Sequence, residues 1–171
     1  KCWNDDVVNH NGEFFQLNNL RVLPKPQQQP PEVWLGGIAP SELKRIARTA
    51  DGWLPSFVTP GDAEAGWATI GEHAKEHNRS IDPEHFGVLI PYALGEVPNA
   101  LIAGLAARRP DLADPSVLVP NTWDALTKMI QEFISVGASK FVVLPIVEPT
   151  SATHWISHLE EASRILLPLQ N

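Results

Sequence analysis

Two adjacent glycines stand where an apolar strand meets a helix, and this point of the chain is well suited to bind a small molecule. In the stretch VWLGGIAP, Gly36 and Gly37 follow three apolar residues and precede Pro40. Glycine allows positive φ and lets a ligand approach the main chain closely. Proline suits the first helical position, where its missing N–H would have no partner. We expect free N–H groups on Gly37, Ile38 and Ala39 at a helix N-terminus, which favours an anion.

The expected ligand of this turn is a phosphate or the edge of a planar cofactor. The motif is shorter than the G-x-G-x-x-G pattern of dinucleotide-binding proteins. Taken alone, the two glycines also fit a plain strand–helix turn that binds nothing. The flanking sequence has to decide between these two interpretations.

The composition is that of a globular protein with one sizeable core. Of the 171 residues, 43% are hydrophobic and 19% are charged. The net charge of −7 argues against non-specific binding to nucleic acid or to an anionic membrane. The longest aliphatic run, residues 141–147, is far shorter than the ~18 residues of a membrane span. A single cysteine, Cys2, excludes an internal disulfide framework and fits a reducing, cytoplasmic location.

Strand-like and helix-like segments alternate along most of the chain, which indicates βαβ units and a parallel sheet. Ahead of them, residues 11–24 predict a hairpin with strands at 13–17 and 20–23 and a turn at Asn18 and Asn19. Four prolines in residues 24–31 predict an extended connector. We expect strands at residues 33–35, 53–57, 86–94 and 141–146. We expect helices at residues 40–50, 61–77, 99–108, 122–136 and 152–167.

The ordered motifs around the glycine pair resemble the bacterial luciferase-like family of flavin- and deazaflavin-dependent oxidoreductases. The family pattern has a G-x-[FY] hairpin, a proline-rich connector, a strand ending in Gly-Gly, an alanine- and arginine-containing helix, and A-D-G-W. Here these elements stand at residues 12–14, 24–31, 33–37, 43–50 and 50–53. HNRSIDP and TWDALTKMIQEFISVGASKFVVLP, at residues 77–83 and 122–145, are similar to later family segments. Asn78 stands there where glycine is usual.

The resemblance spans roughly residues 12–145 and implies an α/β fold, the C-terminal half of a luciferase-like (β/α)₈ TIM barrel. A short β-hairpin insertion lies near its N-terminus. Four strand–helix units are half of the eight that the full barrel needs. Residues 1–171 are therefore expected to be a single-domain fragment that lacks the N-terminal half. We expect this fragment alone to be inactive, and to form a homo-oligomer or associate with the missing half.

The resemblance also implies an oxidoreductase that transfers hydride, or activates oxygen, on a small organic substrate. The long GGIAP…ADGWLP form is most similar to members that use coenzyme F420, so F420 is the expected cofactor and FMN the alternative. The expected cofactor contacts, carried over by motif position, are Gly36, Gly37, Ile38 and Ala39.

The end of the following strand offers three further candidates. Trp53, Ser56 and Thr59 are expected near the same carboxyl-terminal edge of the barrel, where they would contact substrate or phosphate. No catalytic residue is assigned, because the acid/base residue of such enzymes usually comes from the other half of the barrel.

Two other functions stay open at this point. One is a non-catalytic barrel protein of the same family that binds flavin or nothing and acts as a partner subunit. The other is an unrelated phosphate-binding barrel enzyme, such as an aldolase or isomerase. The histidine pairs at 73/77 and 154/158 have i, i+4 spacing but no third ligand, so we predict solvated helix faces and no metal site.

Overall fold

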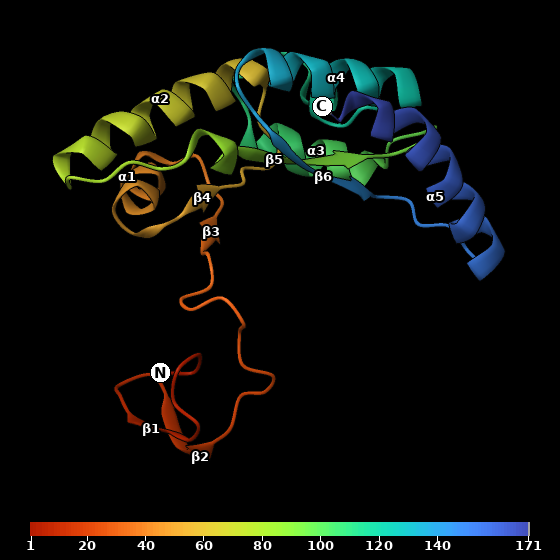
Figure 1. The fold of residues 1–171 in the computed structure, drawn as a ribbon. Helices are drawn as coiled ribbons and strands as arrows, with labels where there is room; N and C mark the ends of the chain where they lie inside the picture. The colour runs from red at the N-terminus through yellow and green to blue at the C-terminus, as the bar shows by residue number, and fades with distance from the viewer. Residues whose placement is uncertain (171) are drawn as a thin grey trace. The chain divides into compact units, whose positions relative to one another are not determined.

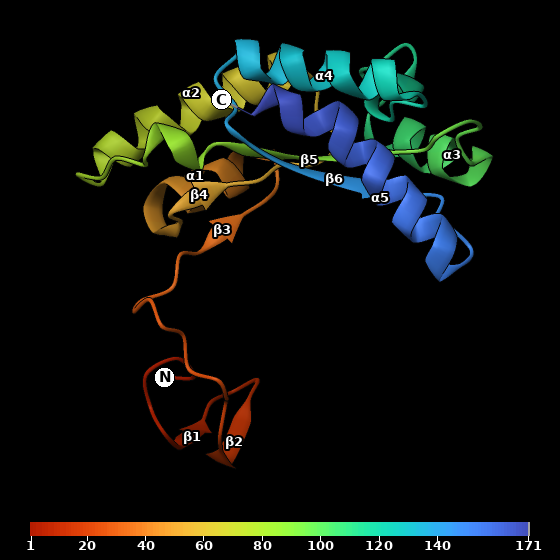
Figure 2. The same cartoon turned by 45° about the vertical axis from the view of Figure 1, so that its right-hand side comes forward.

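The computed structural model describes residues 1–170 and divides into two compact units, Lys1–Val33 and Trp34–Asn171 (Figures 1 and 2). Unit 1 contains a hairpin and the proline-rich connector. Unit 2 contains a parallel sheet with its helices. The expectation of a single domain stays a prediction. Among the described residues, no helix has the length and apolar character needed to cross a membrane.

Unit 1 is built on an antiparallel hairpin of β1 (Val8–Asn11) and β2 (Gln16–Leu20). A hairpin is therefore present, but its predicted strands at 13–17 and 20–23 and its predicted turn at Asn18 and Asn19 are wrong. The chain turns earlier, where the Gly12 N–H donates to the Phe15 carbonyl at 2.9 Å. Asn19 does adopt a left-handed φ of 51°, but inside β2 beside a register shift, and its N–H donates to the Asn9 side chain. Residues 24–33 form neither helix nor strand, as their prolines predict.

Unit 2 contains four parallel strands in the order in which they follow along the chain. They are β3 (Trp34–Leu35), β4 (Gly52–Trp53), β5 (Gly87–Tyr92) and β6 (Lys140–Pro145). β3 pairs with β4, and β5 pairs with β6 over its full length. Two parallel bridges, Trp53 to Phe86 and Ser56 to Leu89, connect β4 with β5. All four predicted strands are present, although β3 and β4 are shorter than expected.

The helices of unit 2 begin and end within one residue of the predicted positions. Their bounds are α1 (Pro40–Thr49), α2 (Pro60–Glu76), α3 (Asn99–Arg108), α4 (Trp123–Ser135) and α5 (Ala152–Leu166). The side chains of Thr59, Thr122 and Ser151 accept backbone N–H groups at the starts of α2, α4 and α5. Such caps stabilise helix starts and are encoded locally, which explains the agreement.

The segment HNRSIDP ends one helix and caps another. Asn78 has a φ of 53°, the left-handed conformation that a glycine would also adopt there. Arg79 then donates from its two terminal nitrogens to the Ala47 and Ala50 carbonyls, at 2.8 and 2.7 Å. These carbonyls lie at the end of α1, where intrahelical partners run out. The residues after α2 thus fix the position of α1 and of β4 directly behind it.

The main core lies between one face of the sheet and the helices α1, α2 and α4 (Figure 1). Trp53, Trp67 and Phe86 stack at its centre, and the Trp67 and Phe86 ring centroids are 4.9 Å apart. Gly66 on α2 makes room for this stack, because a Cβ there would overlap the Trp53 ring. The stack anchors β4 and β5 to α2.

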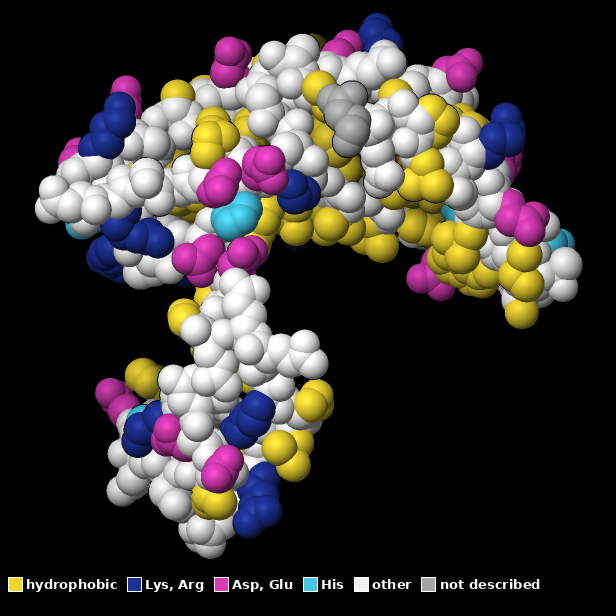
Figure 3. Space-filling model, in the orientation of Figure 1, with side chains coloured by type: hydrophobic (Ala, Val, Ile, Leu, Met, Phe, Trp, Pro, Cys, Tyr) yellow, Lys and Arg dark blue, Asp and Glu magenta, His cyan; other side chains and the backbone are white. Residues whose placement is uncertain are grey.

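The opposite face of β6 is apolar and is left exposed by the described residues. Along β6, Phe141 and Val143 pack against the core, whereas the alternate residues Val142 and Leu144 are 45% and 48% exposed. Figure 3 shows hydrophobic side chains gathered along this side of unit 2. On the helix side of β6, no residue of α5 is fully buried, and a groove of about 1000 Å³ lies among α4, β6 and α5. Parallel sheets are normally covered on both faces.

Candidate functional site

The carboxyl ends of the four strands bring four connecting segments to one edge of the sheet, which we call the rim. The rim comprises residues 36–39, 54–59, 93–97 and 146–151, which follow β3, β4, β5 and β6. In the (β/α)₈ barrels that the sequence resembles, active sites lie on the loops at this end. The predicted site residues 36–39, Ser56 and Thr59 therefore lie on two neighbouring rim segments, and Trp53 lies at the end of β4, just before the second.

The glycine turn, residues 36–39, requires both of its glycines. Gly37 has a φ of 99°, a conformation that side-chain-bearing residues rarely adopt. A Cβ on Gly36 would lie 3.1 Å from the Leu54 carbonyl oxygen, a tight contact that would require the Leu54 backbone to move by a few tenths of an ångström. Gly36 is exposed to solvent and Ile38 is 38% exposed. The turn thus presents bare backbone and an aliphatic side chain at the rim.

Trp53 supports this turn from inside the core. Its indole Nε1–H donates to the Gly37 carbonyl oxygen at 2.9 Å, and the residue has no exposed surface. The expectation that Trp53 contacts substrate or phosphate does not fit this burial. Its role here is to hold the glycine turn in place.

The expectation of free N–H groups at the start of α1 is wrong for two of the three residues named. Both Ile38 and Ala39 donate their backbone N–H groups to Glu42 Oε2, each at 3.1 Å. Ala39 has no side-chain acceptor of its own, so the carboxylate three residues later satisfies the helix start. The spacing A-P-S-E carries this signal in the sequence, as the acidic half of a capping box.

This carboxylate decides which part of a cofactor fits the glycine turn. A phosphate at the start of α1 would meet the negative charge of Glu42 and find two of the N–H donors already bonded. A phosphate therefore does not fit there. The edge of a planar ring fits, because it needs only close approach to Gly36 and apolar contact with Ile38.

The second rim segment contains Ser56 and Thr59, in different situations. Ser56 is exposed, and its backbone bridges to Leu89 of β5. Thr59 is the N-cap of α2, and its hydroxyl accepts from the Asp62 N–H at 3.1 Å and donates to Asp62 Oδ2 at 2.8 Å. The Thr59 hydroxyl is thus occupied in capping, while Ser56 faces solvent. Whether either residue binds a ligand stays a prediction.

Arg109, at the end of α3, contacts this second segment although it lies far from it in the sequence. This residue was not among the predicted site residues. Its side chain is 13% exposed and donates to the Phe57 carbonyl oxygen at 3.1 Å. It also forms ion pairs with Asp62 at 3.0 Å and with Asp111 at 2.7 Å. The hydrogen bond from Arg109 lowers the pKa of Asp111 below its usual value. No local motif marks Arg109, because its partners lie up to 52 residues away.

A small second core covers part of the rim. Ala93, Leu105, Leu118 and Val119 are buried together, and Phe57 and Ile146 are among the half-buried residues that pack against them. Leu105 belongs to α3 and Leu118 to the short helix η2 (Pro115–Leu118). The segment between β5 and α4, residues 93–122, which we call the insertion, therefore packs on rim residues that follow β4 and β6.

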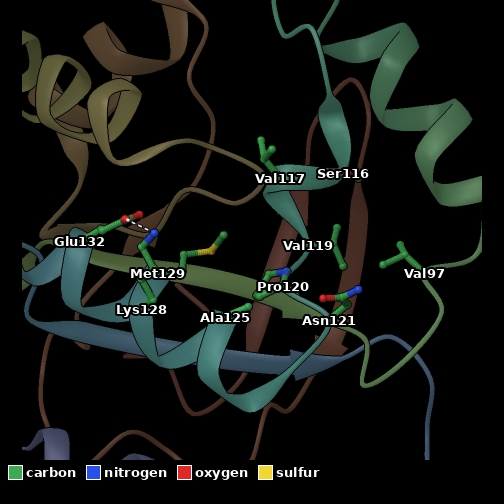
Figure 4. Close-up of a pocket in the computed structure, with 10 residues that line it drawn as sticks. All are labelled: Val97, Ser116, Val117, Val119, Pro120, Asn121, Ala125, Lys128, Met129 and Glu132. Carbon is green, nitrogen blue, oxygen red and sulfur yellow. Dashed lines mark ion pairs between the residues drawn. The ribbon is translucent and has the colours of Figure 1, made fainter.

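A pocket of about 270 Å³ opens between η2 and α4, with Ser116, Asn121 and Met129 in its lining (Figure 4). Lys128 and Glu132, an ion pair at 3.8 Å, also border it. None of the predicted site residues lines this pocket. The pocket and the glycine turn are therefore separate features.

The expectation of a solvated histidine face is wrong for His158. Its Nε2 lies 2.5 Å from the Tyr92 hydroxyl, and its ring stacks on the Tyr92 ring. Burial raises the pKa of Tyr92, which keeps its hydroxyl protonated and able to donate. His73, by contrast, pairs with Glu76 along α2 at 3.1 Å. Within residues 1–170, no group of three side chains is arranged to hold a metal ion.

The family of the protein follows from comparison with known sequences. The model of the luciferase-like monooxygenase family matches residues 1–138. This chain belongs to that family. A curated relative, the phthiodiolone/phenolphthiodiolone dimycocerosates ketoreductase of Mycobacterium kansasii, is 30% identical over 78 residues, which are 44% of this chain and 21% of the relative.

Solved structures support the same fold. An F420-dependent secondary alcohol dehydrogenase, in complex with an F420–acetone adduct, matches 99% of this chain and 58% of its own with a TM-score of 0.65 and 16% identity. A riboflavin lyase with modified FMN and riboflavin matches 92% of this chain and 48% of its own, with a TM-score of 0.54 and 13% identity. The chain thus spans about half the length of these structures. The predicted fold, half of a luciferase-like TIM barrel, is confirmed.

Proposed function

We propose that the rim of unit 2 forms part of the cofactor site of an oxidoreductase that uses coenzyme F420, with FMN as the alternative. The observation that carries this proposal is the exposed turn at Gly36 and Gly37, placed at the carboxyl end of a barrel strand in a member of this family. The long GGIAP…ADGWLP form and the F420-bound alcohol dehydrogenase among the structural neighbours support F420 over FMN.

The residues of this chain would bind the cofactor by its ring. Gly36 offers unobstructed backbone and Ile38 an exposed aliphatic surface, while Glu42 excludes a phosphate from the start of α1. The bound cofactor supplies hydride transfer, or reaction with oxygen in its reduced form. The chain orients the ring and keeps water from one of its edges. The acid/base residue and the cofactor phosphate would be bound by other parts of the protein.

The experiment that tests this proposal starts from the full-length protein, expressed in a host that makes both FMN and F420. Mass spectrometry of the ligand released on denaturation identifies the cofactor, and fluorescence titration with F420 and with FMN gives both dissociation constants. We expect Gly36→Ala to weaken cofactor binding at least tenfold, because the new methyl group occupies the ring edge and crowds the Leu54 carbonyl.

Gly71→Ala is the matched control for this substitution. Gly71 is an exposed glycine of α2 with no atom within 4 Å of an added Cβ, so its substitution should leave cofactor binding unchanged. If Gly36→Ala binds cofactor as tightly as Gly71→Ala, the glycine turn does not contact the ring.

One observation favours a second candidate, a non-catalytic barrel protein that acts as a partner subunit. Both helices that begin at the first two rim segments have their N-termini satisfied by their own carboxylates, Glu42 and Asp62. A full-length protein that releases no cofactor and binds neither F420 nor FMN would contradict the first proposal and favour this second one. Family membership removes the third candidate, the unrelated phosphate-binding enzyme.

We also propose that further βα units of the same barrel cover the exposed face of β6. The alternating exposed residues Val142 and Leu144, together with the half-length match to complete barrels, support this arrangement. In the full-length protein, Leu144→Asp should then lower the melting temperature strongly, because a charge would be buried without a partner. An unchanged melting temperature would show that this face stays in solvent or belongs to a loose contact between copies.

A further inference from the structure

We propose that Arg109 is a positioning residue that holds the second rim segment and the start of α2, residues 56–62, in their observed shape. The insertion that carries Arg109 would thereby control the geometry of one side of the site. The contacts themselves are independent of which ligand binds, but their importance for binding rests on the proposed function. Three observations at this segment support the role.

The first observation is the set of contacts that Arg109 makes. It stands at the C-cap of α3, and it donates to Phe57 O at 3.1 Å while pairing with Asp62 at 3.0 Å. Two further hydrogen bonds, from Nε and Nη2, reach the Asp111 carboxylate at 3.0 and 2.7 Å. The planar guanidinium therefore links the insertion to the loop in a fixed geometry, which a lysine does not reproduce.

The second observation is the backbone of Phe57. Its φ of 55° lies in the left-handed region, which is unfavourable for a bulky residue. Such a conformation persists only when the surroundings determine it. The Phe57 carbonyl is held by Arg109, and its side chain packs against the second core. Both restraints come from the insertion between β5 and α4.

The third observation is that Asp62 serves two partners at once. Its Oδ2 accepts from the Thr59 N–H and hydroxyl, both at 2.8 Å, and also faces Arg109. The same carboxylate thus joins the cap of α2 to the insertion. Loss of Arg109 would remove one partner of Asp62, loosen the cap that Asp62 forms with Thr59, and free the loop ahead of it, including the exposed Ser56.

The role predicted for Arg109 is local rather than global. Neither Arg109 nor its partners belong to the main core of Trp53, Phe86 and the strand residues. The Asp111 side chain is 59% exposed, so that ion pair lies at the surface. We therefore expect substitutions of Arg109 to loosen residues 56–62 while the strands stay protected.

Amide hydrogen exchange on the full-length protein tests this directly in three variants. In Arg109→Gln, exchange at residues 57–63 should accelerate at least about tenfold, with exchange in β5 unchanged. Arg109→Lys should fall between this variant and wild type, because one ammonium reaches fewer of the acceptors. Asp111→Asn is the control, since it leaves the contacts to Phe57 and Asp62 in place, and should change exchange less than about twofold.

The outcomes separate this role from the proposed function. Unchanged exchange at residues 57–63 in Arg109→Gln, or equal acceleration across all strands, would overturn the positioning role. If Arg109→Gln does not fold, the Arg109→Lys variant gives the same comparison with charge retained. Cofactor titration of the wild type tests the proposed function by itself. Where the wild type binds cofactor, Arg109→Gln should raise the dissociation constant more than it lowers kcat.

Discussion

The glycine turn after β3 and the segment after β4 share a residue pattern at the start of the following helix, but different contacts hold them in place. Each leads into a helix with proline at its first position, Pro40 or Pro60, and an acidic residue two places further on, Glu42 or Asp62. Glu42 bonds only to backbone N–H groups of its own turn. Asp62 does the same for its own helix and also pairs with Arg109 from α3.

This difference separates a turn that is encoded locally from a loop that depends on a distant insertion. The glycine turn needs its two glycines, the nearby Glu42 and support from Trp53 beneath it. The second segment needs Arg109 to hold a left-handed Phe57. The glycine turn should therefore be rigid, whereas the segment after β4 should be able to change its conformation.

The largest effect is expected from removing the support under the glycine turn. Trp53→Ala deletes a fully buried indole and its hydrogen bond to Gly37, which should cost about 3–5 kcal/mol in the free energy of unfolding. Trp53→Phe keeps much of the ring packing and should cost clearly less. Denaturant unfolding measures both. Equal costs would show that the hydrogen bond, rather than the buried ring, holds the turn.

Gly37→Ala is expected to strain the backbone of the same turn. The φ of 99° and the overlap of a new Cβ with the Glu42 carboxylate should lower the free energy of unfolding by about 1–3 kcal/mol. Gly71→Ala, in an exposed helical position, should instead stabilise by up to about 1 kcal/mol. Thermal unfolding of both variants, side by side, checks the contrast. A harmless Gly37→Ala would mean that the turn is not rigid.

A double-mutant cycle sharpens the comparison between the two carboxylates. Asp62→Asn should cost about 1–2 kcal/mol, and Glu42→Gln about 0.5–1 kcal/mol, because the amide oxygen still accepts from the helix start. Combined with Arg109→Gln, Asp62→Asn should show a coupling energy of at least about 0.5 kcal/mol, and Glu42→Gln none beyond about 0.3 kcal/mol. Similar coupling energies for Asp62 and Glu42 would contradict the view that Arg109 holds only the segment after β4.

The smallest effect is the pH dependence contributed by Asp111. Because Arg109 lowers the Asp111 pKa in the folded state, the contribution to stability is present above the unfolded value of about 3.9. It is lost as the pH falls through the lower folded value. The stability difference between wild type and Asp111→Asn should therefore shrink on acidification below about pH 4. Urea unfolding at pH 7 and pH 3 measures it, and a constant difference would contradict the assignment.

Features encoded by neighbouring residues were predictable from the sequence. The starts of α2, α4 and α5 follow capping residues that can be read locally, such as Thr59. The left-handed turn at Asn78 falls where a glycine is usual. The hairpin register was predicted wrongly, because two asparagines suggested a turn and the chain instead turned at residues 12–15.

The candidate site was predictable in position but not in its electrostatics. The glycine turn lies on the rim as expected, yet Glu42 fills the donors that were expected to be free. The spacing of Glu42 from Ala39, three residues as in a capping box, could have indicated this from the sequence. Arg109 was not predictable, since only the fold brings the end of α3 to Phe57. Contacts between residues far apart in sequence leave no local pattern to interpret.

The aromatic stack at the centre of unit 2 gives the protein an intrinsic spectroscopic signal. The Trp53 and Trp67 rings are held 6.5 Å apart and only 5° from parallel, with Phe86 beside them. Aromatic rings in such a fixed arrangement produce near-ultraviolet circular dichroism, which disappears when side-chain packing melts. Because Trp53 also bonds to the glycine turn, this signal should report on the order of the rim without any added label.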